Sequence, residues 1–311
     1  MRVLIFGSNG LVGASCKKIF QSSSKVSDLF CSTREDTDLF DFDQTKKTIL
    51  NFNPDLIINA AAKVGGILAN NTYRVDFLLE NLKININILE SVISNSNIKV
   101  INLGSSCIYP LGVDNPIKEE YFMTGKLEPT NSPYALAKIT AIELGDSISK
   151  QYGNKIINLM PTNLYGPGDN FSENSSHVIP GLIRRMHKAK SDNDDNFYIW
   201  GTGKPLREFL YSYDLAECIE FISDIDTDEN LINVGSGQEI SILDLAKLIK
   251  DIVGYEGELN FDNTKPDGNP RKLLESNIIN DLGWKPKTSL KDGLFETYRW
   301  FLDNLEKKIK L

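Results

Sequence analysis

Short apolar segments that alternate with helical segments constrain the fold of this chain more than any other feature. Continuous runs of strand-forming residues lie at 3–6, 29–33, 56–60, 100–104 and 156–160. The first run is followed by glycines and then by a helix-like stretch from Leu11 to about Phe20. Apolar strands separated by helices are typical of a parallel sheet that is covered on both faces. We therefore predict an α/β fold with a doubly wound parallel sheet.

A glycine-rich turn joins the first predicted strand to the first predicted helix. Its sequence is Gly7-Ser8-Asn9-Gly10-Leu11-Val12-Gly13, with GxxGxxG spacing. Glycines let the backbone approach a pyrophosphate, and the N-terminus of a helix favours its negative charge. We predict that this turn binds a dinucleotide in a Rossmann-type domain.

The end of the second predicted strand bears on the choice of dinucleotide. An Asp or Glu at this point accepts hydrogen bonds from the ribose of NAD, whereas this chain has Ser32-Thr33-Arg34. Arg34 can pair with a 2′-phosphate. We predict NADP(H) as the cofactor, although Asp36 and Asp38 follow closely.

The pattern loosens after Pro161, where residues 162–170 read as a loop rich in turn-forming residues. We expect helices from His177 to Lys190 and over 241–253, a polar loop at 191–196 and a strand at 259–261. The predicted NADP-binding Rossmann domain covers residues 1–164, with a returning segment at about 211–234. Residues 165–210 and 235–311 form the predicted substrate domain, a smaller mixed α/β C-terminal unit.

Composition excludes several classes of function. Acidic residues outnumber basic ones by 42 to 34, and a net charge of −8 disfavours binding to nucleic acid or to an anionic membrane. We see no signal peptide and no apolar run long enough to cross a membrane, so we expect a cytoplasmic protein. The four scattered cysteines and two histidines predict free thiols and no metal site.

Tyr134 and Lys138 predict the chemistry of the site. Four residues apart on a predicted helix, they share one face, and the Lys ammonium can lower the pKa of a phenol that is normally about 10. Tyr134 is therefore a candidate proton donor. Ser105 and Cys107 follow the fourth predicted strand and are candidates for the same site.

Together these features resemble an extended short-chain dehydrogenase/reductase. Five longer strings are similar to the GDP-L-fucose synthase family, and the resemblance covers nearly the whole chain. They are Ala60-Ala61-Ala62-Lys63-Val64-Gly65-Gly66-Ile67, Leu103-Gly104-Ser105-Ser106-Cys107-Ile108-Tyr109-Pro110, Pro161-Thr162-Asn163-Leu164-Tyr165-Gly166-Pro167, Asn174-Ser175-Ser176-His177-Val178-Ile179-Pro180 and Lys265-Pro266-Asp267-Gly268.

This resemblance implies a two-stage reaction on GDP-4-keto-6-deoxy-D-mannose and a homodimeric enzyme. The sugar would be epimerised at C3 and C5, and NADPH would then reduce the C4 ketone. Cys107 and His177 match the base and acid of the epimerisation. Tyr134, Lys138 and Ser105 match the groups that serve the reduction.

The resemblance also assigns binding residues. Arg185, Trp200, Arg207 and Asp267 match positions that hold the nucleotide sugar. The implied cofactor-binding residues are Gly7, Ser8, Asn9, Gly10, Leu11, Val12, Gly13, Arg34, Ala61, Leu103, Gly104, Ser105, Ser106, Lys138, Pro161, Thr162, Asn163, Leu164 and His177. We assign the second histidine, His187, to a solvated helix face.

Two positions depart from the family pattern. Asn9 stands where some members have an Arg that helps to hold the 2′-phosphate, so the preference for NADP depends more on Arg34. The run Tyr211-Ser212-Tyr213-Asp214 replaces the usual His-Val-Asp-Asp and predicts a changed wall near the substrate.

Other readings remain open. The first is a C4-reductase that acts on a related GDP-4-keto-6-deoxy sugar, such as a heptose, and leaves C3 and C5 untouched. A 4,6-dehydratase fits less well, because it needs an acidic pair where this chain has Ser106-Cys107-Ile108. A 4-epimerase would retain NAD, and a non-catalytic nucleotide sensor would have no need of Tyr134 and Lys138.

Overall fold

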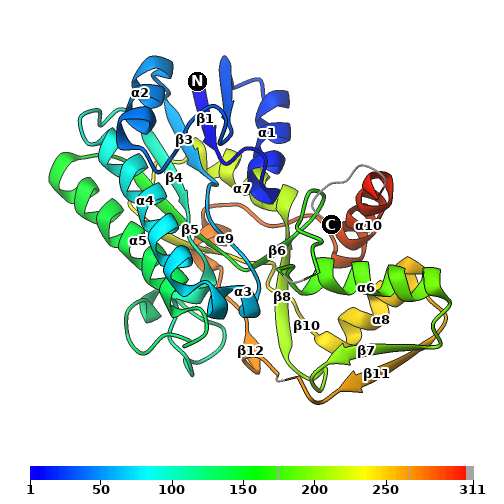
Figure 1. Cartoon of the computed structure of the whole chain (residues 1–311). Coiled ribbons are helices and arrows are strands. Elements are labelled where there is room, and N and C mark those ends of the chain that lie inside the picture. The colour runs from blue at the N-terminus through cyan, green and yellow to red at the C-terminus, as the bar shows by residue number, and fades with distance from the viewer. Residues whose placement is uncertain (174, 266, 306–311) are drawn as a thin grey trace.

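The computed structural model describes residues 1–173, 175–265 and 267–305, which form a larger and a smaller lobe (Figure 1). Asn174 and Pro266, which belong to two of the motif strings, lie outside the described residues. Residues 306–311, at the end of the predicted substrate domain, lie outside them as well.

The larger lobe is built on a six-stranded parallel sheet, which confirms the predicted doubly wound Rossmann-type fold. The strand order is β2-β1-β3-β4-β5-β9. β2 is added on one side of β1 and the later strands on the other, so the order of strands reverses between β1 and β3. In folds of this kind, ligands bind at the carboxyl ends of the strands beside such a switch point. The strands are β1 (Arg2–Phe6), β2 (Asp28–Ser32), β3 (Leu56–Asn59), β4 (Lys99–Leu103), β5 (Ile156–Pro161) and β9 (Leu231–Val234).

Helices cover both faces of this sheet, and β1 shows why. Val3 and Ile5 enter one core with Cys16 of α1 (Leu11–Ser22) and Ile219 of α7 (Ser212–Ser223). Leu4 and Phe6 point the other way, into a core shared with α2 (Phe42–Phe52), α4 (Arg74–Val92) and α5 (Ser132–Tyr152). A strand buried on both sides needs apolar residues at every position, which the sequence provides.

The smaller lobe is a mixed α/β unit, as predicted. In it β8 (Leu206–Tyr211) pairs antiparallel with β10 (Glu239–Ser241) and parallel with β12 (Arg271–Lys272) and β6 (Asn163–Tyr165). A separate parallel pair joins β7 (Asn196–Trp200) to β11 (Glu258–Asp262). Three helices pack around these strands: α6 (Val178–Asp192), α8 (Ile242–Val253) and α10 (Leu290–Asn304).

The structure differs from the sequence-based assignment at three places. The predicted loop at 162–170 contains strand β6, because Asn163–Tyr165 pairs in parallel with β8. The polar loop at 191–196 is shorter, since α6 continues to Asp192 and β7 begins at Asn196. Residues 235–311 were assigned to the substrate domain, whereas Ile279 of α9 (Asn277–Asp281) lies in the core of the larger lobe. In the described part of the chain, no helix has the length and apolar character of a membrane span.

Candidate active site

The glycine turn is shaped for close approach by a ligand. Gly7 has a φ of 77°, and a Cβ there would lie 2.7 Å from the backbone of Ala61. A Cβ on Gly13 would lie 2.1 Å from the Gly7 carbonyl oxygen, so the helix can approach the strand only without that atom. Asn9 and Gly10 are exposed, and Gly10 caps α1. These features fit a bound pyrophosphate.

Arg34 lies exposed in a turn just after β2. The neighbouring Asp36 carboxylate accepts hydrogen bonds from the Thr33 amide at 2.8 Å and the Thr33 hydroxyl at 2.7 Å. These bonds hold the pKa of Asp36 below its usual value. Asp38 accepts from the Phe40 amide at 2.9 Å. Both acids that complicated the prediction are thus engaged locally, and Arg34 is the exposed cation at the strand end.

Tyr134 and Lys138 lie one turn apart on α5, next to the end of β4. The Lys138 ammonium is almost fully buried and donates a hydrogen bond to the Leu103 carbonyl oxygen at 2.6 Å. It lies 5.9 Å from the centre of the Tyr134 ring. Phe77 of α4 packs edge-on against that ring at 6.2 Å between centroids. The pair is therefore held rigidly, with Leu103 fixing the cation.

The electrostatics of this pair correct one sequence-based prediction. Burial raises the pKa of Tyr134, Cys107 raises it further, and a hydrogen bond with Ser105 opposes them. We predicted that Lys138 lowers this pKa. Instead the ammonium is engaged with Leu103, and burial lowers the pKa of Lys138 itself to about 8. Tyr134 is therefore a neutral phenol at neutral pH, which still carries the proton needed by a donor.

Ser105 and Cys107 join the same group at the end of β4. Ser105 caps the short 3-10 helix η1 (Ser106–Ile108), and its hydroxyl oxygen accepts from the Cys107 amide at 3.3 Å. Burial raises the pKa of the Cys107 thiol, while Lys272, Ser105 and Lys138 lower it. Lys272 was not singled out in the sequence. The one sequence feature that could have pointed to Lys272 is its position shortly after the motif string that begins at Lys265.

Lys272 connects this group to the smaller lobe. It lies on β12 directly opposite Arg207 of β8. Burial lowers the pKa of both side chains, and the nearby Arg207 charge lowers the pKa of Lys272 further. Like charges that face each other across a sheet are unfavourable without a counter-charge. The arrangement can accommodate an anionic ligand between the lobes.

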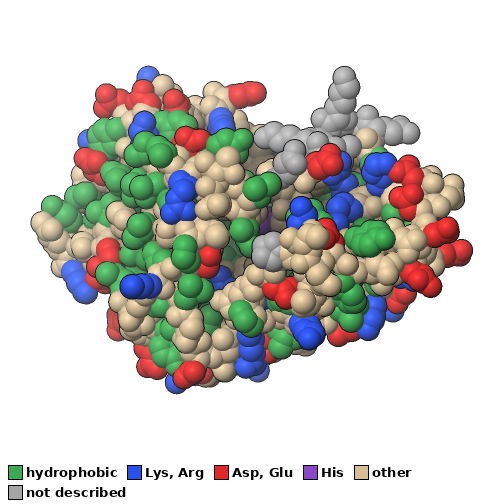
Figure 2. Space-filling view, turned by 60° about the horizontal axis from the view of Figure 1, so that its bottom comes forward, with side chains coloured by type: hydrophobic (Ala, Val, Ile, Leu, Met, Phe, Trp, Pro, Cys, Tyr) green, Lys and Arg blue, Asp and Glu red, His purple; other side chains and the backbone are tan. Residues whose placement is uncertain are grey.

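His177 approaches from the smaller lobe at the N-cap position of α6. Its side chain is exposed, and Figure 2 shows a hollow between the lobes in which a histidine surface is visible. Desolvation by the surrounding protein lowers the pKa of His177, and the Gly65 backbone opposes that shift.

The four predicted substrate residues gather in the smaller lobe. Arg185 lies 4.9 Å from the ring of Trp200, which remains 57% exposed, and donates to the Tyr198 carbonyl oxygen at 3.0 Å. Asp267 accepts from the amide and hydroxyl of Thr202, which lower its pKa, and Arg207 lowers that pKa further. Exposed aromatic surface beside guanidinium groups can bind a base and a diphosphate.

The remaining predicted cofactor residues follow strand ends of the larger sheet. Ala61 follows β3, and its amide donates to the Asn59 side chain at 3.3 Å. Gly104 and Ser106 follow β4, where a Cβ on Gly104 would overlap Met160. The residues Pro161, Thr162, Asn163 and Leu164 lie where β5 passes into β6. Carboxyl ends of adjacent parallel strands share one edge of the sheet, which also holds Tyr134 and Ser105.

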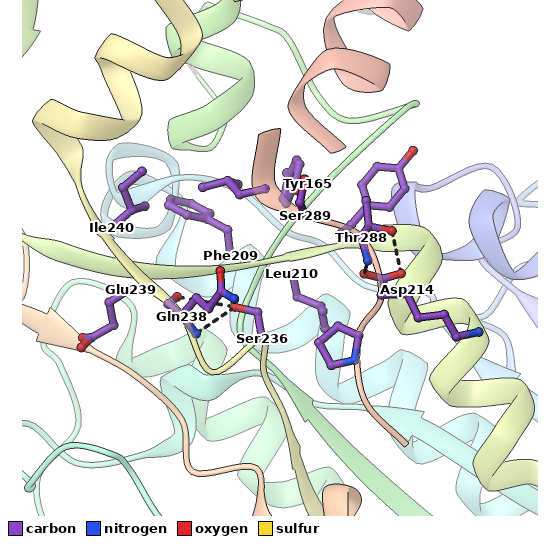
Figure 3. Close-up of a pocket in the computed structure, with 14 residues that line it drawn as sticks. Tyr165, Phe209, Leu210, Asp214, Ser236, Gln238, Glu239, Ile240, Thr288 and Ser289 are labelled. Carbon is purple, nitrogen blue, oxygen red and sulfur yellow. Dashed lines mark hydrogen bonds between the residues drawn. The ribbon is translucent and has the colours of Figure 1, made fainter. Parts of the chain in front are cut away.

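One prediction made outside this group is wrong, and another stays open. His187 does not lie on a solvated face, because α10 covers it: its Nδ1 lies 3.0 Å from the Tyr298 hydroxyl, and Phe301 packs against its ring. The changed wall expected at Tyr211–Asp214 stays a prediction, and Ser212 of this run hydrogen-bonds Ser15 of α1 at 2.9 Å. Tyr211 and Asp214 line a separate pocket of about 370 Å³ on β8, in which Asp214 accepts from Thr288 (Figure 3).

The fold and the site define the class: a Rossmann-type enzyme that binds a nicotinamide dinucleotide. The model of the NAD dependent epimerase/dehydratase family matches residues 3–235. A GDP-L-fucose synthase of Arabidopsis thaliana is 45% identical over 98% of this chain and 94% of its own. A GDP-L-fucose synthetase of Naegleria fowleri bound to NADP has a TM-score of 0.90, 30% identity, and covers 99% of this chain and 96% of its own. A GDP-mannoheptose C4 reductase of Campylobacter jejuni with NADP bound has a TM-score of 0.85 and 33% identity, and the match covers 97% of this chain and 98% of its own.

The chain belongs to the NAD dependent epimerase/dehydratase family and, within it, to the GDP-L-fucose synthases.

Proposed function

We propose that this enzyme converts GDP-4-keto-6-deoxy-D-mannose to GDP-L-fucose by 3,5-epimerisation and NADPH-dependent 4-reduction. The observation that carries the proposal is the convergence of Ser105, Cys107, Tyr134 and Lys138 at the end of β4. His177 stands at the start of α6 in the other lobe. The relative from Arabidopsis thaliana, 45% identical over nearly the full length, supports the choice of reaction.

The reduction uses the group on α5. NADPH, when bound, supplies hydride to C4. Tyr134 gives its proton to the C4 oxygen, and Ser105 orients the ketone by a hydrogen bond. Lys138, tied to the Leu103 carbonyl, holds positive charge beside the tyrosinate that forms. Because burial keeps the resting phenol neutral, the proton is present before the reaction begins.

Epimerisation requires one proton-transferring group on each face of the sugar ring. The 4-keto group acidifies the C3 and C5 protons, so a base on one face and an acid on the other can invert each carbon through an enolate. We assign Cys107 as the base and His177 as the acid. Burial favours the neutral thiol at rest, and the ammonium groups of Lys272 and Lys138 favour the thiolate that a base requires.

The smaller lobe holds the GDP portion in this proposal. Arg185 and Arg207 bind the diphosphate, Trp200 supplies an apolar wall, and Asp267 accepts from sugar or guanine donors. Thr202 donates one hydrogen bond to each Asp267 carboxylate oxygen. Each oxygen keeps a further lone pair that can accept from the substrate. We assign NADP(H) rather than NAD(H), because Arg34 is the exposed cation at the end of β2.

We further propose that the enzyme is a cytoplasmic homodimer. Its four cysteines are free thiols in the structure, as expected for a reducing compartment. Helices α4 and α5 lie side by side on the outside of the larger lobe and are the proposed dimer surface (Figure 1).

A deuterium-exchange assay tests the reaction in two steps. The enzyme is incubated with GDP-4-keto-6-deoxy-D-mannose in D₂O without NADPH, and we expect deuterium at C3 and C5 by NMR. Addition of NADPH should then give GDP-L-fucose, with NADH much less effective. Tyr134→Phe should reduce the second step by at least about 100-fold while the exchange continues. No deuterium at either carbon would refute the epimerisation.

A reductase without epimerase activity is the second candidate, favoured by the likeness to the GDP-mannoheptose C4 reductase. That enzyme type would reduce a GDP-4-keto sugar without any deuterium incorporation. The same assay with a panel of GDP-4-keto-6-deoxy hexoses and heptoses separates the two candidates.

A further inference from the structure

Phe77 of α4 is a buried aromatic residue that contacts the proposed proton donor. Its side chain is only 2% exposed. The Phe77 and Tyr134 rings lie 6.2 Å apart between centroids, and their planes meet at 85°. Aromatic pairs attract each other at such distances in the perpendicular arrangement. The ring of Tyr134 on α5 is therefore held from the neighbouring helix.

The segment that follows β3 also packs against Phe77. A Cβ on Gly65 would lie 3.2 Å from Phe77 Cζ and 3.1 Å from the Cβ of Ala69 on α3 (Ile67–Thr72), so glycine makes this close packing possible. The Lys63 ammonium lies 6.0 Å from the centre of the Phe77 ring. Contacts from this segment and from Tyr134 leave the Phe77 ring little freedom to move.

A buried amide fixes that segment in turn. Asn81 lies one turn after Phe77 on α4 and is fully buried. Its Oδ1 accepts from the Lys63 amide at 3.0 Å, and its Nδ2 donates to the Lys63 carbonyl oxygen at 3.1 Å. The same Nδ2 donates to the Phe77 carbonyl oxygen at 2.7 Å. The backbone of Lys63 is thus tied to the part of α4 that carries Phe77.

We propose that Phe77 is a positioning residue for the C4 reduction, because it holds the Tyr134 ring in the orientation from which its hydroxyl reaches the ketone. This inference rests on the proposed role of Tyr134 as proton donor. A donor must lie within about 2.6–3.2 Å of the atom that it protonates, and another χ1 rotamer would carry the phenol hydroxyl out of that range. The Lys138 ammonium cannot follow such a movement, since it is bonded to the Leu103 carbonyl oxygen.

This role separates the two stages of the proposed reaction. Cys107 and His177 serve the epimerisation, whereas Tyr134 serves only the reduction. Loss of the Phe77 ring should therefore slow the reduction and leave deuterium exchange at C3 and C5 in place. General damage to the larger lobe would lower both, because Cys107 lies in the same lobe.

Phe77→Leu tests the inference, since it keeps an apolar side chain but removes the perpendicular ring. We expect kcat for NADPH-dependent reduction of GDP-4-keto-6-deoxy-D-mannose to fall by about tenfold to 100-fold, with little change in KM or in the exchange. In a Tyr134→Phe background the same substitution should not slow the residual reduction further, because the hydroxyl through which it acts is already absent. Phe77→Met serves if Phe77→Leu folds poorly.

The matched control is Phe20→Leu, which removes a buried ring from another core of the larger lobe. It should leave both stages unchanged. NMR of tyrosine labelled with ¹³C at Cζ gives a readout that does not depend on activity, with the Tyr134 signal assigned by its absence from Tyr134→Phe. We expect one sharp Tyr134 signal in the wild type and a broadened or doubled signal in Phe77→Leu.

A wild-type rate of reduction in folded Phe77→Leu would overturn the inference, and so would a further loss of the same size in the Tyr134→Phe background. A wild type that does not reduce the keto sugar, or a Tyr134→Phe variant that reduces it at the full rate, would overturn the proposed function instead. In that case the NMR comparison still decides whether Phe77 fixes the Tyr134 ring.

Discussion

Asp169 shows how one buried group sets the pH dependence of stability. Its carboxyl is 7% exposed, Oδ1 accepts from the Asn170 amide at 2.7 Å, and Oδ2 has no partner among the described residues. Burial raises its pKa to about 7, and the Asn170 bond only partly opposes this. Because the folded pKa exceeds the unfolded value, the stabilising contribution is complete below the unfolded pKa and is lost as the pH rises to about 7.

We expect Asp169→Asn to remove this dependence. Between pH 5 and 8 the free energy of unfolding of the variant should gain about 3 kcal/mol relative to the wild type. Urea unfolding at pH 5, 6, 7 and 8 measures the difference. Asp251→Asn, at an exposed position of α8, should show no such trend. A difference for Asp169→Asn that is constant with pH would contradict the prediction.

At the residue scale, the sequence predicts which side chains share a helix face but not their electrostatics. The four-residue spacing of Tyr134 and Lys138 suffices to place both on one helix face. Their pKa shifts depend on burial and on the Leu103 carbonyl, which are known only from the packing. Lys272 was missed because it meets Cys107 only through the pairing of β12 with β8.

At the scale of elements, an asparagine ladder fixes the register of the main sheet. Asn59, Asn102 and Asn158 lie opposite one another on β3, β4 and β5 and are buried. Asn59 donates to Asn102 at 2.9 Å, and Asn102 donates to Asn158 at 3.0 Å. A slip of one residue would leave all three amides without these partners in an apolar core.

Replacing the middle residue should therefore be costly. Asn102→Leu leaves a donor of Asn59 and an acceptor of Asn158 unpaired, and we expect a loss of about 2–5 kcal/mol in the free energy of unfolding. Adding Asn158→Leu should cost less than it does in the wild type, because its partner is already absent. Urea unfolding of the two single variants and the double variant gives the coupling. Strictly additive losses would show that the ladder contributes nothing as a unit.

The strands that carry this ladder were predictable from the sequence, whereas the short elements β6 and α9 were not. Buried parallel strands such as β4 appear in the sequence as uninterrupted apolar runs. β6 has only three residues, and its identity as a strand depends on β8, which comes more than forty residues later. Short elements carry too little periodic signal, so α9 was likewise assigned to the other lobe.

At the scale of the whole molecule, apolar residues remain exposed on the outer surface of the larger lobe. Val75, Leu79 and Ile86 of α4 are 65%, 49% and 36% exposed, and Leu136 of α5 is 48% exposed. The spacing of the three α4 residues puts them on one side of the helix. Figure 2 shows hydrophobic side chains gathered on the left, the side on which α4 and α5 lie in Figure 1. Exposed apolar side chains grouped on one helix face in this way indicate an interaction site.

We expect this surface to form the homodimer, with the two helices of one protomer packed on those of its partner. Light scattering after size exclusion should give about twice the chain mass of 34.9 kDa for the wild type. Leu79→Asp would bury an unpaired carboxylate in the interface, so it should give the monomer mass at micromolar concentration. Leu302→Asp, at a 40% exposed position on α10 in the other lobe, should remain dimeric. A monomeric wild type would refute the dimer, and a dimeric Leu79→Asp would place its interface elsewhere.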